Sequence, residues 1–98
     1  MREKHMKQLG FHIWCVGGIS RAWRYFQHDG SYLLVTDIGG FDLPELHGPY
    51  QAMQLTANDE LVQIQPLIRR ASRLVRWLRS RERLVNRIKP SKPTVTDL

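Results

Sequence analysis

Cysteine is nearly absent from this 98-residue chain, in which Cys15 is the single one. One cysteine cannot form an internal disulfide, and a small chain without disulfides is typical of a reducing compartment. Long apolar runs are missing too, because no stretch approaches the roughly 20 residues that span a bilayer. We therefore expect a cytoplasmic protein that does not enter a membrane.

Basic residues are missing from residues 25–68, which contain no lysine or arginine and six acidic residues: Asp29, Asp37, Asp42, Glu45, Asp59 and Glu60. Residues 69–98 show the opposite pattern, with ten lysines and arginines against Glu82 and Asp97. Such asymmetry between segments predicts either an external anionic partner or pairing of the two segments with each other.

Residue patterns that carry catalysis or hold metals are also lacking. Cys15 lies three residues from His12, and on a strand this spacing points the two side chains to opposite faces. The four histidines are scattered, and there is no second cysteine to complete a metal-ligand spacing. Neither pair of adjacent glycines belongs to a phosphate-binding loop. We expect no enzymatic activity, no metal and no cofactor.

Short β-strands separated by turn signals dominate residues 11–65. The pattern predicts strands over 11–16, 19–27, 31–37 and 50–56, with a glycine- and proline-rich loop over 38–49. Asp29-Gly30 predicts a two-residue hairpin turn, which would place Phe26 opposite Leu33 and Arg24 opposite Val35. Residues 61–65 fit a strand or a helix, and Pro66 favours a strand followed by a helix that begins at Pro66.

A helix over about 66–88 follows from apolar residues that recur at spacings of three and four, among them Ile68, Ala71, Val75 and Leu78. The tail over 90–98 holds two prolines and is expected to be disordered. We therefore predict a single α+β domain: an antiparallel sheet of three to five strands with one long amphipathic C-terminal helix packed on one face.

Eight arginines and no lysine fall between Arg69 and Arg87, mostly opposite the apolar stripe. Arginine is suited to planar, bidentate recognition of phosphates and carboxylates. A solvated helix face, an external polyanion, and pairing with acidic segments or proteins all remain open interpretations. The candidate binding residues on this helix are Arg69, Arg70, Arg73, Arg76, Trp77, Arg79, Arg83 and Arg87.

A second candidate surface lies on the strand over 19–27, where cations alternate with aromatic residues. Sheets that bind single-stranded nucleic acid use aromatic side chains to stack bases and arginines to hold the backbone. The alternative is that the strand simply supplies aromatic residues to the core. Its candidate binding residues are Arg21, Trp23, Arg24 and Tyr25.

These features predict a small non-enzymatic protein that binds nucleic acid or a nucleoprotein complex through its arginine-rich helix. The alternative is a stoichiometric inhibitor or adaptor of the phage or plasmid type that binds a larger host protein, such as a bacterial CRISPR-type enzyme. Because the apolar stripe is wide for so small a domain, a homodimer through the C-terminal helix is a further expectation.

Overall fold

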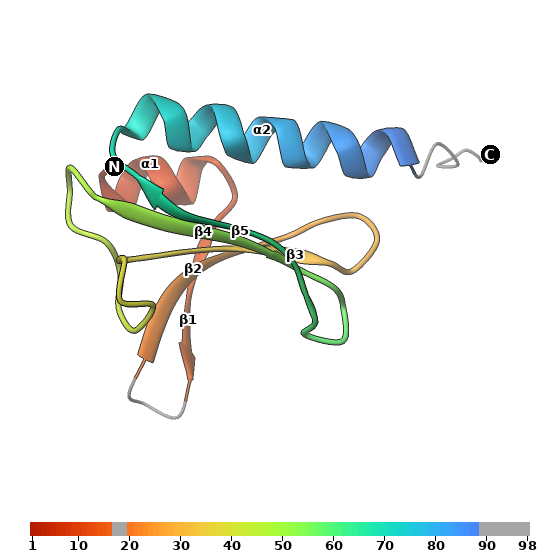
Figure 1. The fold of residues 1–98 in the computed structure, drawn as a ribbon, viewed down its shortest axis with the longest axis horizontal. Helices are drawn as coiled ribbons and strands as arrows, with labels where there is room; N and C mark the ends of the chain where they lie inside the picture. The colour runs from red at the N-terminus through yellow and green to blue at the C-terminus, as the bar shows by residue number, and fades with distance from the viewer. Residues whose placement is uncertain (17–19, 89–98) are drawn as a thin grey trace.

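The computed structural model describes residues 1–16 and 20–88, with side chains except those of Val16 and residues 82–88. Seven elements follow one another along the chain (Figure 1): α1 (Glu3–Gln8), β1 (His12–Val16), β2 (Ser20–Phe26), β3 (Tyr32–Thr36), β4 (Tyr50–Leu55), β5 (Leu61–Ile68) and α2 (Ala71–Ile88). The predicted disordered tail over 90–98 lies outside the described residues.

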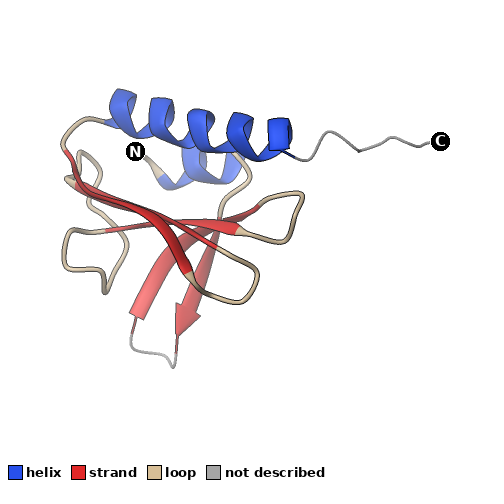
Figure 2. Cartoon of the chain, turned by 45° about the vertical axis from the view of Figure 1, so that its right-hand side comes forward, coloured by secondary structure: helices blue, strands red, loops and turns tan. Residues whose placement is uncertain are grey.

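The strands form one antiparallel sheet in the order β1-β2-β3-β4-β5, so each strand pairs with its neighbour in the sequence. Both helices lie on the same face of this sheet, and within residues 1–16 and 20–88 no helix lies on the other face (Figures 1 and 2). The α+β class and the antiparallel sheet are therefore confirmed, with five strands.

The hairpin between β2 and β3 differs by one residue from the predicted register. The Gln27 amide donates to the Ser31 carbonyl at 2.8 Å, so the loop holds three residues and Phe26 pairs with Tyr32. Gly30 adopts a φ of +88°, as expected for the last residue of a three-residue hairpin loop. The Asp29 carboxylate also accepts a bond from the Ser31 amide, which stabilises this turn. Arg24 consequently pairs with Leu34 instead of Val35.

This register separates two clusters of side chains on the two faces of the sheet. The larger cluster faces the helices and contains Met6, Phe11, Trp23, Leu33, Val35, Tyr50, Ala52, Ile68, Leu74 and Leu78. The smaller one gathers on the opposite face around Ala22, Tyr32 and Leu34, with Trp14, Met53 and Leu55 packed against it. The helices therefore cover the main core, and the second cluster is buried from solvent by its own side chains and those packed against it.

The boundary between the last strand and α2 lies further along the chain than predicted. Strand β5 continues through Pro66 to Ile68, and the helix begins at Ala71. Ile68 is buried and pairs with Tyr50, which gives the strand end a tertiary contact that a helix starting at Pro66 would lose. Proline is tolerated here because β5 is an edge strand.

Two features of the helices position the surface discussed below. Helix α1 was not anticipated from the sequence, and it places Met6 in the main core. Helix α2 inserts Leu74 and Leu78 into the same core, and Ala71 and Trp77 pack against that core. These contacts fix the first turns of α2 over the end of β5.

Candidate functional site

A groove of about 670 Å³ runs between the end of β5 and the first turns of α2. Four of its lining residues are arginines, two from the junction and two from the helix: Arg69, Arg70, Arg73 and Arg76. Gln65, Leu67, Ile68, Trp77 and Ser80 complete the lining. The groove thus combines a strongly cationic rim with an apolar and aromatic wall.

The path of the chain explains why the arginines gather here. Ile68 and Leu74 are both anchored in the core, so the short segment between them must turn at the surface. The amides of Arg73 and Leu74 both donate to the Arg70 carbonyl at 3.1 Å, which begins the helix at this point. Residues three apart on a helix share a face, so Arg73 and Arg76 lie on the same side of α2.

The electrostatics of the groove favour an anion. Its four arginines are exposed, and α2 has no acidic residue in its first turn. Among the side chains that the structure describes, the ion pairs join Lys7 to Glu3 and Arg21 to Asp42, and neither includes an arginine of the groove. The positive end of the helix dipole adds to the same potential.

Trp77 forms part of the wall rather than an exposed anchor. It is half-buried against the main core, and its indole Nε1 is buried without a hydrogen-bond partner. The Arg81 guanidinium carbon lies 5.9 Å from the Trp77 ring centroid, and Arg81 donates to the Gln63 side chain. Arg81 therefore ties α2 to β5.

The other helical arginines are placed differently. Arg79 is exposed, but it borders a small apolar cavity of about 80 Å³ with Leu9 and Val75 and does not line the groove. Arg83 and Arg87 lie in the part of α2 whose side chains are not described. Of the predicted helical site residues, the structure brings together Arg69, Arg70, Arg73, Arg76 and Trp77.

The predicted aromatic strand does not join the groove, because its residues point elsewhere. Trp23 is only 4% exposed and belongs to the core, and Tyr25 is half-buried with its ring centroid 5.4 Å from that of Phe11. The Arg21 Nε donates to the Asp42 carboxylate at 2.8 Å, and this bond is the main cause of the lowered pKa of Asp42. None of these three side chains lines the groove, and Tyr25 instead lines the small cavity that Arg79 borders.

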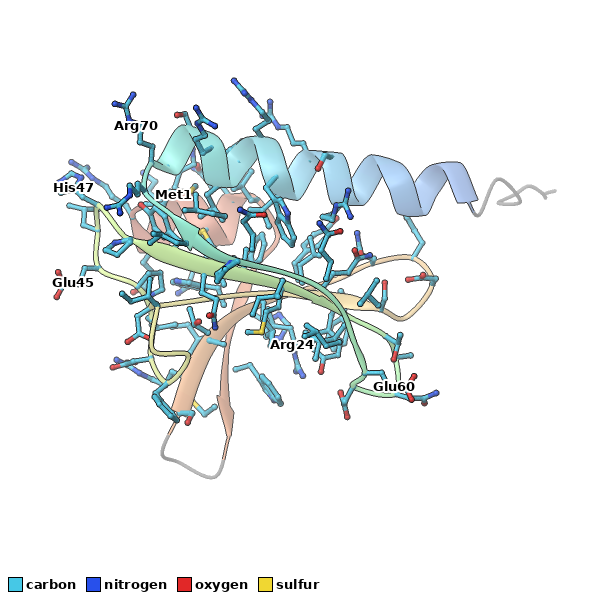
Figure 3. The ribbon with its side chains drawn as sticks, in the orientation of Figure 1. Met1, Arg24, Glu45, His47, Glu60 and Arg70 are labelled. Atoms are coloured by element: carbon cyan, nitrogen blue, oxygen red, sulfur yellow. The ribbon has the colours of Figure 1, made fainter. Side chains whose placement is uncertain are left out.

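Arg24 lies on the sheet face opposite the helices, whereas Arg70 lies on the helix side (Figure 3). Its guanidinium carbon is 4.5 Å from the ring centroids of both Trp14 and Phe26 and 5.8 Å from that of Tyr32. Its Nε donates to His12 Nε2 at 3.2 Å. Burial, and secondly the Arg24 charge, lower the pKa of His12.

Sequence reasoning missed this cluster of Trp14, Arg24, Phe26 and Tyr32 because the predicted register set Arg24 opposite Val35. The cluster would have been predicted from a three-residue loop between β2 and β3, because that loop places Arg24, Phe26 and Tyr32 on one face of the sheet. In this arrangement Arg24 covers the Trp14 and Phe26 rings. Those rings are thereby less available for stacking on a ligand.

Searches for similar proteins give no family. No protein-family model, no curated protein and no solved structure matches the chain. Within the described residues, no three His, Cys, Asp or Glu side chains come together where they would hold a metal ion. No helix in the described part of the chain is both long and apolar enough to cross a membrane.

Proposed function

We propose that the chain is a cytoplasmic, non-enzymatic binding protein that contacts the phosphate backbone of nucleic acid through the groove between β5 and α2. One observation carries the proposal: Arg69, Arg70, Arg73 and Arg76 surround a groove and pair with no described carboxylate. Guanidinium groups bind phosphate oxygens in bidentate geometry, and arginine is the usual residue for this task.

The size of the groove supports a polymeric ligand. Its volume of about 670 Å³ lies in the range of pockets that hold drug-sized molecules, so it has room for more than a single phosphate group. The groove is open, and all the charged residues that line it are arginines. Such a lining provides affinity for a backbone without reading bases.

We further infer that α2 keeps its amphipathic pattern to Ile88. Arg83 and Arg87 then continue the cationic side of the helix beyond the groove, and Val85 continues the apolar stripe. A nucleic acid seated at Arg73 and Arg76 would extend along the helix toward these residues.

Salt dependence of binding is the test. Fluorescence anisotropy with labelled single-stranded DNA, duplex DNA and RNA should show affinities that fall steeply as salt rises. Replacing Arg73 or Arg76 with glutamine should weaken binding to all sequences alike and flatten the slope of log K against log salt by about one unit.

Arg79→Gln is the matched control, because Arg79 is an exposed arginine on the same helix outside the groove. It should leave the slope closer to that of the wild type than Arg73→Gln does. The proposal is wrong if no nucleic acid binds at low salt, or if the Arg73→Gln and Arg79→Gln changes are equivalent.

A second candidate function is that of a stoichiometric inhibitor or adaptor that binds a larger host protein. The observation that favours it is the loop between β3 and β4, which exposes Ile38, Phe41 and Leu46. Exposed apolar side chains gathered on one loop are typical of protein interfaces. This function predicts a partner that co-purifies from a bacterial host and is lost on Phe41→Ser, while Arg73→Gln retains it.

A further inference from the structure

We propose that β5 is also a dimerisation strand, which pairs antiparallel with β5 of a second copy of this chain and joins two sheets into one. The strand stands at the edge of the sheet, with β4 on one side and no described strand on the other. It is eight residues long, from Leu61 to Ile68, and all but Ile68 are exposed.

The exposed side chains of β5 are unusual for an unpaired edge. Leu61 is 55% exposed, Val62 56% and Ile64 40%, and the strand contains no charged residue. Natural edge strands are commonly protected by charged side chains, because an apolar edge with free backbone groups recruits another strand. Helix α2 reaches β5 from the core side, through Arg81 and Gln63, and does not occupy the edge.

The charges at the two ends of β5 indicate what the edge pairs with. Asp59 and Glu60 precede the strand, and Arg69 and Arg70 follow it. Glu60 and Arg70 accordingly lie at opposite ends of the sheet edge (Figure 3). The strand is therefore acidic at its beginning, neutral along its length and basic at its end.

This pattern is complementary to itself only in the antiparallel sense. A second β5 running in the opposite direction brings its basic end to the acidic end of the first, at both ends of the pairing. A parallel copy would bring like charges together, which destabilises a strand pair. Identical contacts from both copies are the property of a two-fold symmetric interface.

The register follows from symmetry and from the strand itself. In a two-fold antiparallel pair a residue at the centre faces its own copy, and Ile64 lies near the middle of the neutral stretch. Gln63–Gln65 pair regularly with β4, whereas the register shifts on either side. Together with Pro66, these irregularities limit the backbone ladder to a short segment, so the side chains and charged ends must contribute much of the affinity.

Sedimentation analysis of the full chain over a wide range of protein concentrations tests the proposal. The wild type should be in monomer–dimer equilibrium without any nucleic acid, which keeps this result separate from the proposed function. Ile64→Lys should raise the dissociation constant at least about tenfold, because it sets two ammonium groups against each other. Ile38→Lys is the matched control, since Ile38 is an exposed isoleucine on a loop away from β5.

Charge exchange identifies the orientation. Glu60→Arg and Arg69→Glu should each weaken the dimer, and the double variant should recover affinity because opposite charges meet again in the antiparallel pair. Circular dichroism establishes that each variant is folded. A wild type that is monomeric at every concentration overturns the proposal. So does an Ile64→Lys variant that dimerises like the wild type, or a double variant that is no better than the single ones.

Discussion

The guanidinium carbon of Arg24 lies 4.5 Å from the centroid of the Trp14 ring, in contact with its face. The two residues come from the adjacent strands β1 and β2, and the same guanidinium carbon also lies 4.5 Å from the centroid of the Phe26 ring. The charged side chain thereby shields aromatic surface on the sheet face opposite α1 and α2. We attribute a structural role to Arg24, in contrast to the binding role that the sequence suggested.

Arg24→Gln should therefore lower the free energy of unfolding by about 1 kcal/mol, because it removes the cation–π contacts and keeps a polar side chain of moderate length. Urea unfolding followed by tryptophan fluorescence measures the change. Arg76→Gln, at an exposed position on α2, should change the stability by less than about 0.5 kcal/mol. Equal effects of the two substitutions would contradict the structural role.

The same cluster predicts a dependence of stability on alkaline pH. Burial, and secondly the 2.5 Å hydrogen bond to Asp59, raise the pKa of Tyr32 from 10 to about 12. The unfolded chain then ionises this tyrosine first, so its contribution to stability is complete below pH 10 and is lost as the pH rises toward 12. The free energy of unfolding should fall in this window.

Tyr32→Phe should make that fall shallower, and Asp59→Asn should give an intermediate slope, because it removes the charge beside the phenol. Absorbance of the tyrosinate anion during titration gives an independent measure. Tyr50, whose pKa is also raised by burial, contributes a residual slope in all three proteins. Identical slopes in the wild type and Tyr32→Phe would exclude the assigned cause.

The strands were predictable because the local sequence pattern of each one matches the burial of its side chains in the folded sheet. Alternating apolar residues and the Asp29-Gly30 turn located the first four strands to within one residue, whereas β5 ends three residues beyond the predicted strand over 61–65. The pairing of Phe26 was wrong by one residue, because the turn type depends on whether His28 joins the loop, and Asp-Gly suits both loop lengths. A one-residue shift exchanges the faces, so the Arg24 cluster was missed with it.

The arginine groove was predicted in part. The sequence indicated that Arg73 and Arg76 share a helix face, since this follows from helical periodicity alone. It did not indicate that Arg79 lies apart from the groove, and it left open whether Trp23 is buried, because both depend on how α2 and the sheet pack together. Likewise the start of α2 depends on the contact between Ile68 and Tyr50, which no local signal contains.

Docking of α2 on the sheet should depend on Leu74, which has no exposed surface. Leu74→Ala should lower the free energy of unfolding by about 2–5 kcal/mol, because it removes buried methyl groups and leaves a cavity. Ile38→Ala, at a position 55% exposed, serves as the control and should cost less than about 0.5 kcal/mol. Thermal or urea unfolding distinguishes the two, and a small effect of Leu74→Ala would mean that α2 is not part of the core.

The turn between α1 and β1 provides a test of how tightly α1 is joined to the sheet. Gly10 adopts a φ of +101°, and a Cβ atom there would lie 2.9 Å from the Tyr25 ring. Gly10→Ala therefore combines an unfavourable backbone conformation with a clash against a half-buried ring, and should destabilise the protein by at least about 1–2 kcal/mol.

Gly39→Ala is the control, because the φ of Gly39 lies outside the left-handed region and a Cβ atom there would meet no atom closer than 3.6 Å. Restricting the unfolded chain makes that substitution neutral or slightly stabilising. If both variants unfold at the same urea concentration as the wild type, Gly10 does not hold α1 against Tyr25 as the structure indicates.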